Sequence, residues 1–179
     1  MGVPTLFDRI ISGEVPSHRV AEGEHWYAFL DIFPRCQGHT LVVPKQSVQH
    51  IASLSEASRN ALFEGVAEVQ RRLSLHFSTP DFTVCVHDGP LAGQEVPHVH
   101  VHVLPRQSAD GGLTLHSMWP HSPPMGGKID HSSLALLSER FPTSSSPGEY
   151  LPSKLPISLL YLSHHRALSR QGAIGSCRR

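Results

Sequence analysis

The sequence predicts a domain that mixes five β-strands with two α-helices, followed by a Ser/Pro-rich extension. The first observation is the stretch PHVHVHVLPR (97–106), in which histidine and valine alternate strictly. Such alternation of β-branched residues is typical of a strand. The second observation is a series of apolar residues at helical spacing between Ser55 and His76, which predicts the main helix. A chain of 179 residues is long enough to bury a core of its own.

The first element is a short helix near the N-terminus. PTLFDRIISGEVPS predicts a helix that starts at Thr5 and is stopped by Gly13. Its apolar side consists of Leu6, Phe7, Ile10 and Ile11.

Three strands follow in the next block of sequence. HRVAEGEHWYAFLDI (18–32) predicts a hairpin that turns at residues 22–24. GHTLVVPK (38–45) predicts a third strand, which Pro44 ends.

The main helix begins at Ser55, a favourable N-cap residue, and extends to about His76. Its residues at helical spacing are Leu62, Phe63, Val66, Val69 and Leu73. DFTVCVHDG (81–89) predicts the fourth strand, and the histidine-valine stretch is the fifth. The loop between them contains Gly89-Pro90, Gly93 and Pro97, which are typical of a tight loop with exposed backbone amides.

Composition excludes several classes of protein. The formal net charge is zero, which argues against a general binder of nucleic acid or anionic membranes. No apolar run is long enough to span a bilayer, and the N-terminus lacks a signal-peptide profile. The cysteines Cys36, Cys85 and Cys177 form no paired motif. We therefore expect a soluble protein of a reducing compartment, the cytoplasm or also the nucleus.

The composition changes near residue 130. Residues 131–179 contain 11 serines, as many as the first 130 residues, and six basic against two acidic residues. Ser/Pro-rich sequence of this kind is usually a flexible extension. The sequence thus predicts a folded domain over 1–130 and a basic extension over 131–179.

The three histidines of the fifth strand admit three interpretations. They could be incidental residues of an exposed strand, or ligands of a metal ion. Successive side chains alternate between faces, so His98, His100 and His102 share one face, but the outer two lie about 13 Å apart at roughly 3.3 Å per residue. The third interpretation is a nucleophile or acid/base group acting on an anionic substrate. The glycine-containing loop favours it, because exposed amides bind phosphate oxygens.

DGPLAGQEVPHVHVHVLPR resembles the signature of the histidine-triad family of nucleotide hydrolases and transferases. LFDRIISGEVPS and AFLDIFPRCQGHTLVVPK are similar to the N-terminal blocks of its Hint-like branch, so the resemblance spans roughly residues 5–106. It implies an α+β fold with a five-stranded antiparallel sheet and two main helices. It also implies a homodimer whose sheets join into one.

The resemblance assigns a role to each histidine. His100 would attack the α-phosphorus and form a nucleotidyl-histidine intermediate. His98 would orient it, largely through its backbone carbonyl. His102 would contact the phosphate and help the leaving group depart, and His39 would support the cluster. The phosphate oxygens would be held by Gln94 and by the amides around Gly93.

The same resemblance places the nucleoside. Asp31 would bind both ribose hydroxyls, for which a carboxylate is a suitable double acceptor. The slot for the base would be formed by Phe7, Ile10, Phe29 and Ile32. From spacing alone, these four residues could equally be ordinary core.

Four positions depart from the family pattern. His87 stands where relatives usually carry Asn or Gln facing the phosphate; it could donate a hydrogen bond there, or simply be a polar strand end. Glu95 places an anion beside the phosphate site, which is costly unless it points away. Some relatives bind a structural zinc through a Cys and a His at the positions of Asp8 and Ser47, so no zinc site is expected here.

The resemblance therefore implies an enzyme that cleaves the bond between a nucleotide α-phosphate and an amine, sulfur or phosphate leaving group. Purine nucleoside phosphoramidase is the first interpretation, because the N-terminal blocks are Hint-like. A Fhit-like dinucleoside polyphosphate hydrolase and a non-catalytic nucleotide-binding adaptor stay open as alternatives. We expect a purine nucleotide as substrate, no cofactor or metal, and no nucleic-acid or membrane partner.

Overall fold

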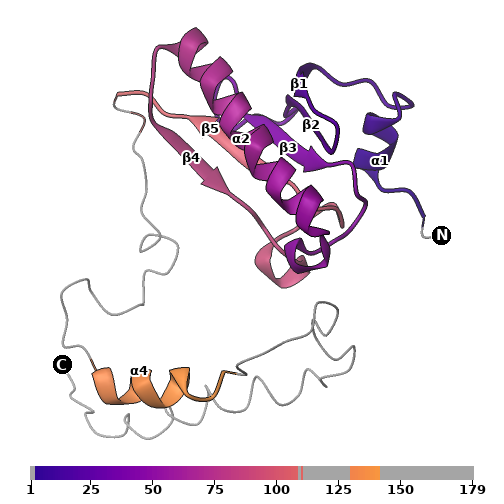
Figure 1. Cartoon of the computed structure of the whole chain (residues 1–179). Helices are drawn as coiled ribbons and strands as arrows, with labels where there is room; N and C mark the ends of the chain where they lie inside the picture. The colour runs from indigo at the N-terminus through magenta and orange to yellow at the C-terminus, as the bar shows by residue number, and fades with distance from the viewer. Residues whose placement is uncertain (1–2, 109, 111–129, 142–179) are drawn as a thin grey trace, which may run out of the picture. The chain divides into compact units, whose positions relative to one another are not determined.

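The computed structural model describes residues 3–108, 110 and 130–141. In the first of these ranges, five antiparallel strands form one sheet in the order β1-β2-β3-β5-β4 (Figure 1). The predicted α+β class with a five-stranded antiparallel sheet is confirmed. The strands are β1 (Arg19–Glu22), β2 (Trp26–Leu30), β3 (Thr40–Pro44), β4 (Phe82–Cys85) and β5 (Val101–Pro105). The other described elements are α1 (Leu6–Ile11), η1 (Ile51–Ser53), α2 (Glu56–Phe77), η2 (Pro90–Ala92) and α4 (His131–Ser138).

Both main helices begin at the predicted caps. The Thr5 side chain accepts a hydrogen bond from the Asp8 amide, and the Asp8 side chain accepts one from the Thr5 amide, which makes a reciprocal capping box on α1. The Ser55 side chain caps α2 by accepting from the Ser58 amide. Gly13 follows α1 with a φ of +81°, a backbone conformation that favours glycine.

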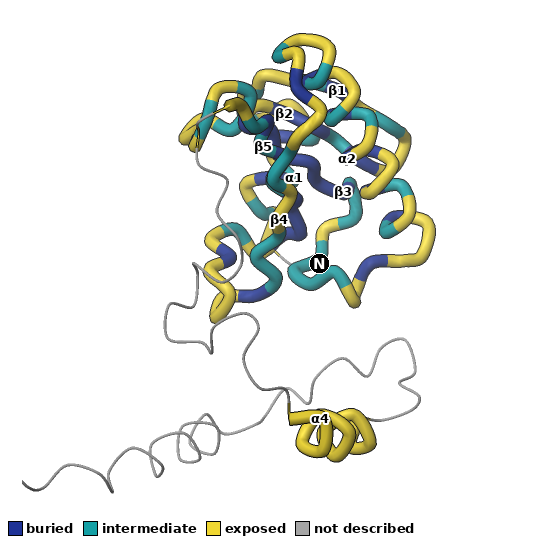
Figure 2. The backbone as a smooth tube through the Cα atoms, turned by 90° about the vertical axis from the view of Figure 1, so that its left-hand side faces the viewer, coloured by how far each residue is buried: buried dark blue, intermediate teal, exposed yellow. Residues whose placement is uncertain are grey.

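One face of the sheet packs against α2. The triad valines Val99, Val101 and Val103 are fully buried there, in one apolar cluster with residues of α2 such as Leu62 and Val66. The predicted alternation of the triad is therefore confirmed on its valine side. Figure 2 shows how the buried residues gather in the strands and along one side of α2.

The opposite face of the sheet packs against α1. A second apolar cluster combines Phe7 and Ile10 of α1 with Phe29, Leu41 and Val43 of the sheet. The Phe7 ring also contacts the rings of His98 and His100, with centroids 5.8 and 5.2 Å apart. The histidine side of the triad therefore lies under α1.

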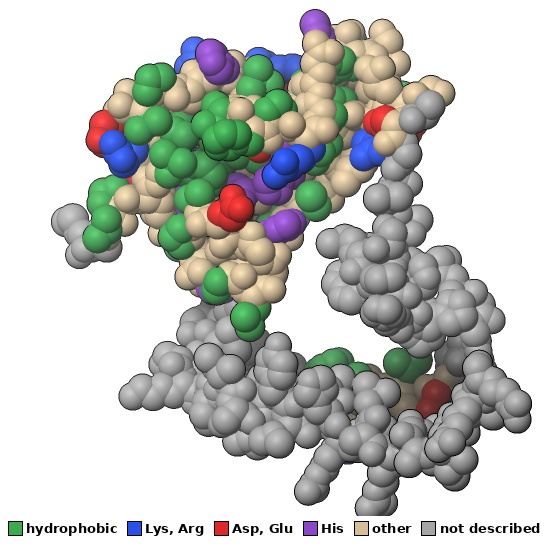
Figure 3. Space-filling view, turned by 180° about the vertical axis from the view of Figure 1, so that it is seen from behind, with side chains coloured by type: hydrophobic (Ala, Val, Ile, Leu, Met, Phe, Trp, Pro, Cys, Tyr) green, Lys and Arg blue, Asp and Glu red, His purple; other side chains and the backbone are tan. Residues whose placement is uncertain are grey.

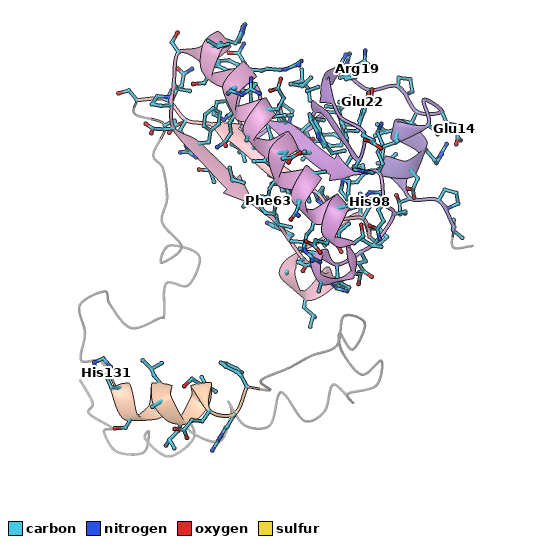
Figure 4. All side chains as sticks on the ribbon, viewed as in Figure 1. Glu14, Arg19, Glu22, Phe63, His98 and His131 are labelled. Atoms are coloured by element: carbon cyan, nitrogen blue, oxygen red, sulfur yellow. The ribbon has the colours of Figure 1, made fainter. Side chains whose placement is uncertain are left out.

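Phe63 differs from the prediction for the main helix. It is 53% exposed, whereas Leu62, Val66, Val69 and Leu73 are buried. Phe63, which Figure 4 labels on α2, directly follows Leu62 and is turned about 100° around the helix axis from it. It therefore leaves the stripe of α2 that faces the sheet.

The fifth strand is shorter than the sequence predicts. β5 begins at Val101, so His98 and His100 precede it and only His102 lies within it. The paired strand β3 ends at Pro44, which has no amide hydrogen to extend the ladder. The Val99 amide donates instead to the Val48 carbonyl, 2.8 Å away.

The region beyond the sheet is described only in part. By internal contacts the chain divides into residues 1–142 and 143–179, and the second unit lies outside the described residues. Within the predicted extension, residues 131–138 form α4. The boundary at residue 130, the flexibility of the extension and the homodimer stay predictions. Among the described helices, none is both long enough and apolar enough to cross a membrane.

Candidate functional site

A pocket of about 480 Å³ opens on the α1 side of the sheet, a size typical of small-ligand sites. Figure 3 shows this side of the molecule, where histidine side chains lie among hydrophobic ones. The predicted site residues that line the pocket are Phe7, Ile10, Phe29, Asp31, Ile32, His39, His87, Gly93, His100 and His102. The predicted residues His98 and Gln94 do not line it.

His98 lies behind the pocket wall and is fully buried. Its Nε2 is 2.9 Å from the Pro44 carbonyl oxygen, and its Nδ1 is 3.0 Å from the Thr5 hydroxyl. Both ring nitrogens are thus engaged by protein groups. What His98 offers to the site is its main-chain carbonyl.

His100 is held by that carbonyl. Its Nδ1 lies 2.7 Å from the His98 carbonyl oxygen, which can only accept, so Nδ1 carries the proton. Burial lowers the pKa of His100 below its ordinary value of 6.5, so the ring is neutral at pH 7. The lone pair of a neutral ring protonated on Nδ1 is on Nε2.

His39 and His102 form a second pair. The Nε2 of His39 is 3.0 Å from the Nδ1 of His102, and the Arg35 amide donates to the Nδ1 of His39 at 3.3 Å. In neutral rings this arrangement places the His39 proton on Nε2, donating to His102, and leaves the His102 proton on its own Nε2. Burial, followed by the neighbouring His100 and His39, lowers the pKa of His102 to about 4. Burial also lowers the pKa of His39.

Asp31 lies at the end of β2 beside this pair. Its Oδ1 accepts the Phe33 amide at 2.8 Å, and its Oδ2 lies 3.3 Å from the His39 Nδ1. The carboxylate is thus fixed at the pocket wall, next to the histidines.

The loop before the triad differs in detail from the prediction. The amides of Gly93 and Gln94 donate to the carbonyls of Pro90 and Gly89 at 3.1 Å each, so the turn of η2 uses them. The Gln94 side chain is buried and donates to the Gln49 carbonyl at 2.8 Å. These groups are therefore used for hydrogen bonds within the protein, and their role in binding phosphate oxygens stays a prediction.

The next two amides of the loop are not used in hydrogen bonds of this kind. Within the described part of the chain, the Glu95 and Val96 amides donate to no acceptor, and both residues line the pocket. His87 lies across the loop, with its Nδ1 3.3 Å from the Gly93 carbonyl oxygen. A Cβ at Gly93 would come within 3.0 Å of that nitrogen, and the φ of Gly93 is +90°. Glycine at this position therefore permits the approach of the His87 ring.

The residues predicted to form the slot for the base lie at the apolar end of the pocket, and their binding of a base stays a prediction. Phe7, Ile10 and Phe29 are at once buried in the α1 cluster and part of the pocket lining. Ile32 lines the pocket but is 71% exposed. The three buried residues thus form a rigid wall, and Ile32 forms part of the rim.

One cluster could hold a cation in principle. Asp31, His39 and His102 each offer a ligand atom, and these atoms lie within 4.8 Å of one another. In the structure His39 instead contacts each of the other two groups directly. At the positions where some relatives carry zinc ligands, the Ser47 hydroxyl donates to the Asp8 carboxylate at 2.8 Å. A serine hydroxyl and a carboxylate do not fit the Cys/His donor set of a structural zinc.

The sequence did not single out several lining residues. Arg35 is the one Lys or Arg among the described residues that line the pocket. Cys85 reaches the pocket because it pairs with His102 across β4 and β5. Strand pairing is a tertiary property, so no local signal marked Cys85. Arg35 lies four residues before His39. This short separation was the only feature of the sequence that pointed to Arg35 as a lining residue.

Comparison with known proteins finds one matching family model and several similar sequences. A family model described as HIT domain matches residues 12–109. An uncharacterised HIT-like protein of Methanocaldococcus jannaschii is 40% identical over 109 residues, covering 59% of this chain and 81% of that protein. Adenosine 5'-monophosphoramidase of Saccharomyces cerevisiae is 35% identical over 115 residues, covering 64% and 69%.

Two further similarities concern the fold and the branch of HIT proteins that the chain resembles. The nitrilase and fragile histidine triad fusion protein NitFhit of Caenorhabditis elegans is 42% identical over 88 residues, covering 49% of this chain and 20% of that protein. The crystal structure of a HIT family member from Bacillus subtilis superposes with a TM-score of 0.63 at 28% identity, covering 79% of this chain and 100% of that one. The matched residues 12–109 contain the whole sheet and every histidine of the pocket.

Proposed function

This chain belongs to the HIT domain family, whose members are nucleotide hydrolases and transferases, and we propose that it transfers a nucleotidyl group first to His100 and then to water. The observation that carries the proposal is the 2.7 Å contact between the His100 Nδ1 and the His98 carbonyl oxygen. It leaves the lone pair on Nε2 of a neutral ring that lines the pocket.

In the first step the His100 Nε2 attacks the α-phosphorus. A nitrogen–phosphorus bond forms while the bond from phosphorus to the leaving group breaks. The bound phosphate anion favours a protonated His102 ring, which takes its second proton from solvent. The leaving group takes the proton from the Nε2 of this imidazolium, so His102 acts as general acid. The Nδ1–H of His100 stays on the His98 carbonyl and stabilises the charge that the ring acquires.

In the second step a water molecule attacks the phosphorus. The water gives one proton back to His102, the nitrogen–phosphorus bond breaks, and a nucleoside monophosphate leaves. His100 regains its lone pair, so both histidines return to their starting state. The donors we propose for the phosphate oxygens are the Glu95 and Val96 amides and the His87 ring, because all three residues line the pocket.

The substrate we propose is a purine nucleoside 5'-phosphoramidate. The apolar wall of Phe7, Ile10 and Phe29 suits a base, and Asp31 suits the ribose hydroxyls. The similarity to the yeast adenosine 5'-monophosphoramidase supports this choice. The second candidate, a dinucleoside polyphosphate, is favoured by the similarity to NitFhit and by the permanent positive charge of Arg35 at the pocket.

Two measurements test the proposal together. Turnover of adenosine 5'-phosphoramidate and of diadenosine triphosphate is compared in the parent and in His100→Asn, and a labelled substrate is quenched during turnover. We expect the phosphoramidate to be hydrolysed faster, an acid-labile label on His100, and turnover in His100→Asn reduced by roughly 10³-fold or more, with nucleotide affinity within a few fold.

Three outcomes separate the alternatives. Faster turnover of diadenosine triphosphate would favour the second candidate. Tight nucleotide binding without turnover of either substrate would favour an adaptor. A label on another residue would show that His100 is not the nucleophile.

A further inference from the structure

The Thr5 hydroxyl lies between the carboxylate that caps α1 and the first histidine of the triad. Its oxygen is 2.8 Å from the Asp8 Oδ2 and 3.0 Å from the His98 Nδ1. We propose that Thr5 is a positioning residue for the reaction: it holds the His98 ring, and through that residue's carbonyl it orients the attacking ring of His100. The inference rests on the proposed function for its kinetic consequence, but the anchoring itself does not.

The carbonyl that orients His100 needs an anchor outside the sheet. The β3–β5 ladder pairs Val42 with Val101 and does not extend to His98. The His98 amide donates to the Val96 carbonyl at 2.7 Å, within its own loop. No ladder hydrogen bond therefore fixes the peptide plane between His98 and Val99. Its Val99 amide donates to the Val48 carbonyl at 2.8 Å, and the His98 side chain supplies the second anchor, on the carbonyl side of the plane.

The His98 side chain is held at both ring nitrogens. The Pro44 carbonyl oxygen can only accept, so the His98 Nε2 carries a proton. The Thr5 hydroxyl lies within hydrogen-bond distance of both the Asp8 Oδ2, to which it donates, and the His98 Nδ1. It has one proton and two lone pairs, so it can donate to one neighbour while its oxygen accepts from another. Thr5 thus links the His98 ring to the carboxylate that caps α1.

Thr5 itself cannot easily rotate away from the ring. Its hydroxyl oxygen accepts the Asp8 amide at 3.2 Å, and its own amide donates to the Asp8 Oδ2 at 2.7 Å. The exposed Ser47 adds a further donor to the same carboxylate oxygen. The capping box of a six-residue helix therefore also fixes the position of the group that holds the triad.

A purely structural role for Thr5 would have a different kinetic signature. α1 supplies Phe7 and Ile10 to the apolar wall of the pocket. Loosening α1 would weaken nucleotide binding and raise KM. Losing the orientation of His100 would instead lower kcat, because a small misplacement of the attacking atom is costly in the transition state.

The test compares Thr5→Val, which removes the hydroxyl at nearly constant shape, with Thr5→Ser, which keeps it. We expect Thr5→Val to lower kcat on adenosine 5'-phosphoramidate by roughly 10- to 100-fold with KM within about threefold. Thr5→Ser should recover kcat to within about twofold of the parent. Ser55→Ala, which removes the N-cap of α2 away from the pocket, is the control for a lost helix cap and should leave both constants near the parent.

A second measurement does not depend on turnover. The ring nitrogen NMR signals of His98 and His100 report tautomer and hydrogen bonding. We expect Thr5→Val to shift the His98 Nδ1 signal and to broaden the His100 Nδ1–H signal, and Thr5→Ser to restore both.

The outcomes distinguish this proposal from the proposed function. Unchanged ring signals in Thr5→Val, or a raised KM with unchanged kcat, would overturn the positioning role while leaving the enzyme assignment intact. A parent that turns over no nucleotide would overturn the enzyme assignment, and the ring signals would still decide whether Thr5 anchors the triad.

Discussion

The carboxylate of Asp31 is held at the pocket wall by the Phe33 amide, which donates to its Oδ1, and its Oδ2 lies beside the His39 ring. A carboxylate in this position can accept two hydroxyl protons at once, which no neutral side chain of similar size does as strongly. The ribose of a nucleotide presents two neighbouring hydroxyls. Asp31 is therefore the residue through which the pocket would distinguish ribonucleotides from deoxynucleotides.

Asp31→Ala should remove that preference. Each hydrogen bond to a charged group contributes roughly 1.5–3 kcal/mol, so the parent should favour the ribonucleotide and the variant should bind both forms nearly equally. Calorimetric titration with AMP and dAMP measures the difference. Glu95→Ala removes another carboxylate of the pocket and should keep the preference. A variant at Asp31 that still discriminates as strongly as the parent would place ribose recognition elsewhere.

Among the helices and strands, the sequence predicted best the features that depend on residues close together in the chain, such as helix caps. Thr5 and Ser55 cap the helices because a side-chain oxygen satisfies a free amide, and Gly13 adopts a positive φ. The sequence could not predict where β5 begins, because its first residue depends on the proline at which the paired strand β3 ends. The orientation of Gln94 was also out of reach, because the Gln49 carbonyl that holds its amide is distant in sequence.

The contact between α2 and β2 gives a prediction about the stability of the fold. A Cβ at Gly65 would lie 2.5 Å from the indole of Trp26, which is itself buried. Alanine gains about 1 kcal/mol of helix propensity over glycine, but overpacking costs about 1–3 kcal/mol. We therefore expect Gly65→Ala to lower the free energy of unfolding by up to about 2 kcal/mol in urea denaturation.

Two companion variants make this test specific. Glu64→Ala, at an exposed neighbouring position of α2, should stay within about 0.5 kcal/mol of the parent. In a Trp26→Phe background the smaller ring should leave room for the methyl group, so the cost of Gly65→Ala should shrink. A stabilising effect of Gly65→Ala in the parent would mean that helix propensity outweighs the steric contact.

On the scale of the whole domain, the fold uses its two faces differently. α2 covers one face of the sheet with an apolar core, and α1 covers part of the other, where the histidines are partly or fully withdrawn from water. Burial disfavours a charged imidazole. The arrangement that keeps the His100 ring neutral must therefore also make the stability of the domain depend on pH.

The sign of that dependence follows from the direction of the shifts. Burial lowers the pKa of His39 and His100, and lowers that of His102 to about 4, from an ordinary 6.5. Between these values the unfolded chain binds more protons than the folded one, so stability rises with pH. The stability that these histidines contribute is fully present above their pKa in the unfolded chain. It is lost as the pH falls toward their lower pKa values in the folded chain. For His102 alone it amounts to at most about 3 kcal/mol, and to less because the ring is only partly buried.

Urea denaturation at a series of pH values from 8 to about 4.5 measures this loss. We expect the free energy of unfolding to fall with decreasing pH in the parent, and to fall less steeply in His102→Gln, which cannot be protonated at that position. His76→Gln is the control, because it removes an exposed histidine of α2 that lies outside the buried cluster, and its slope should match that of the parent. A parent whose stability is level across this range, or a His102→Gln slope equal to the parent's, would show that the histidine cluster is not held in its neutral form by burial.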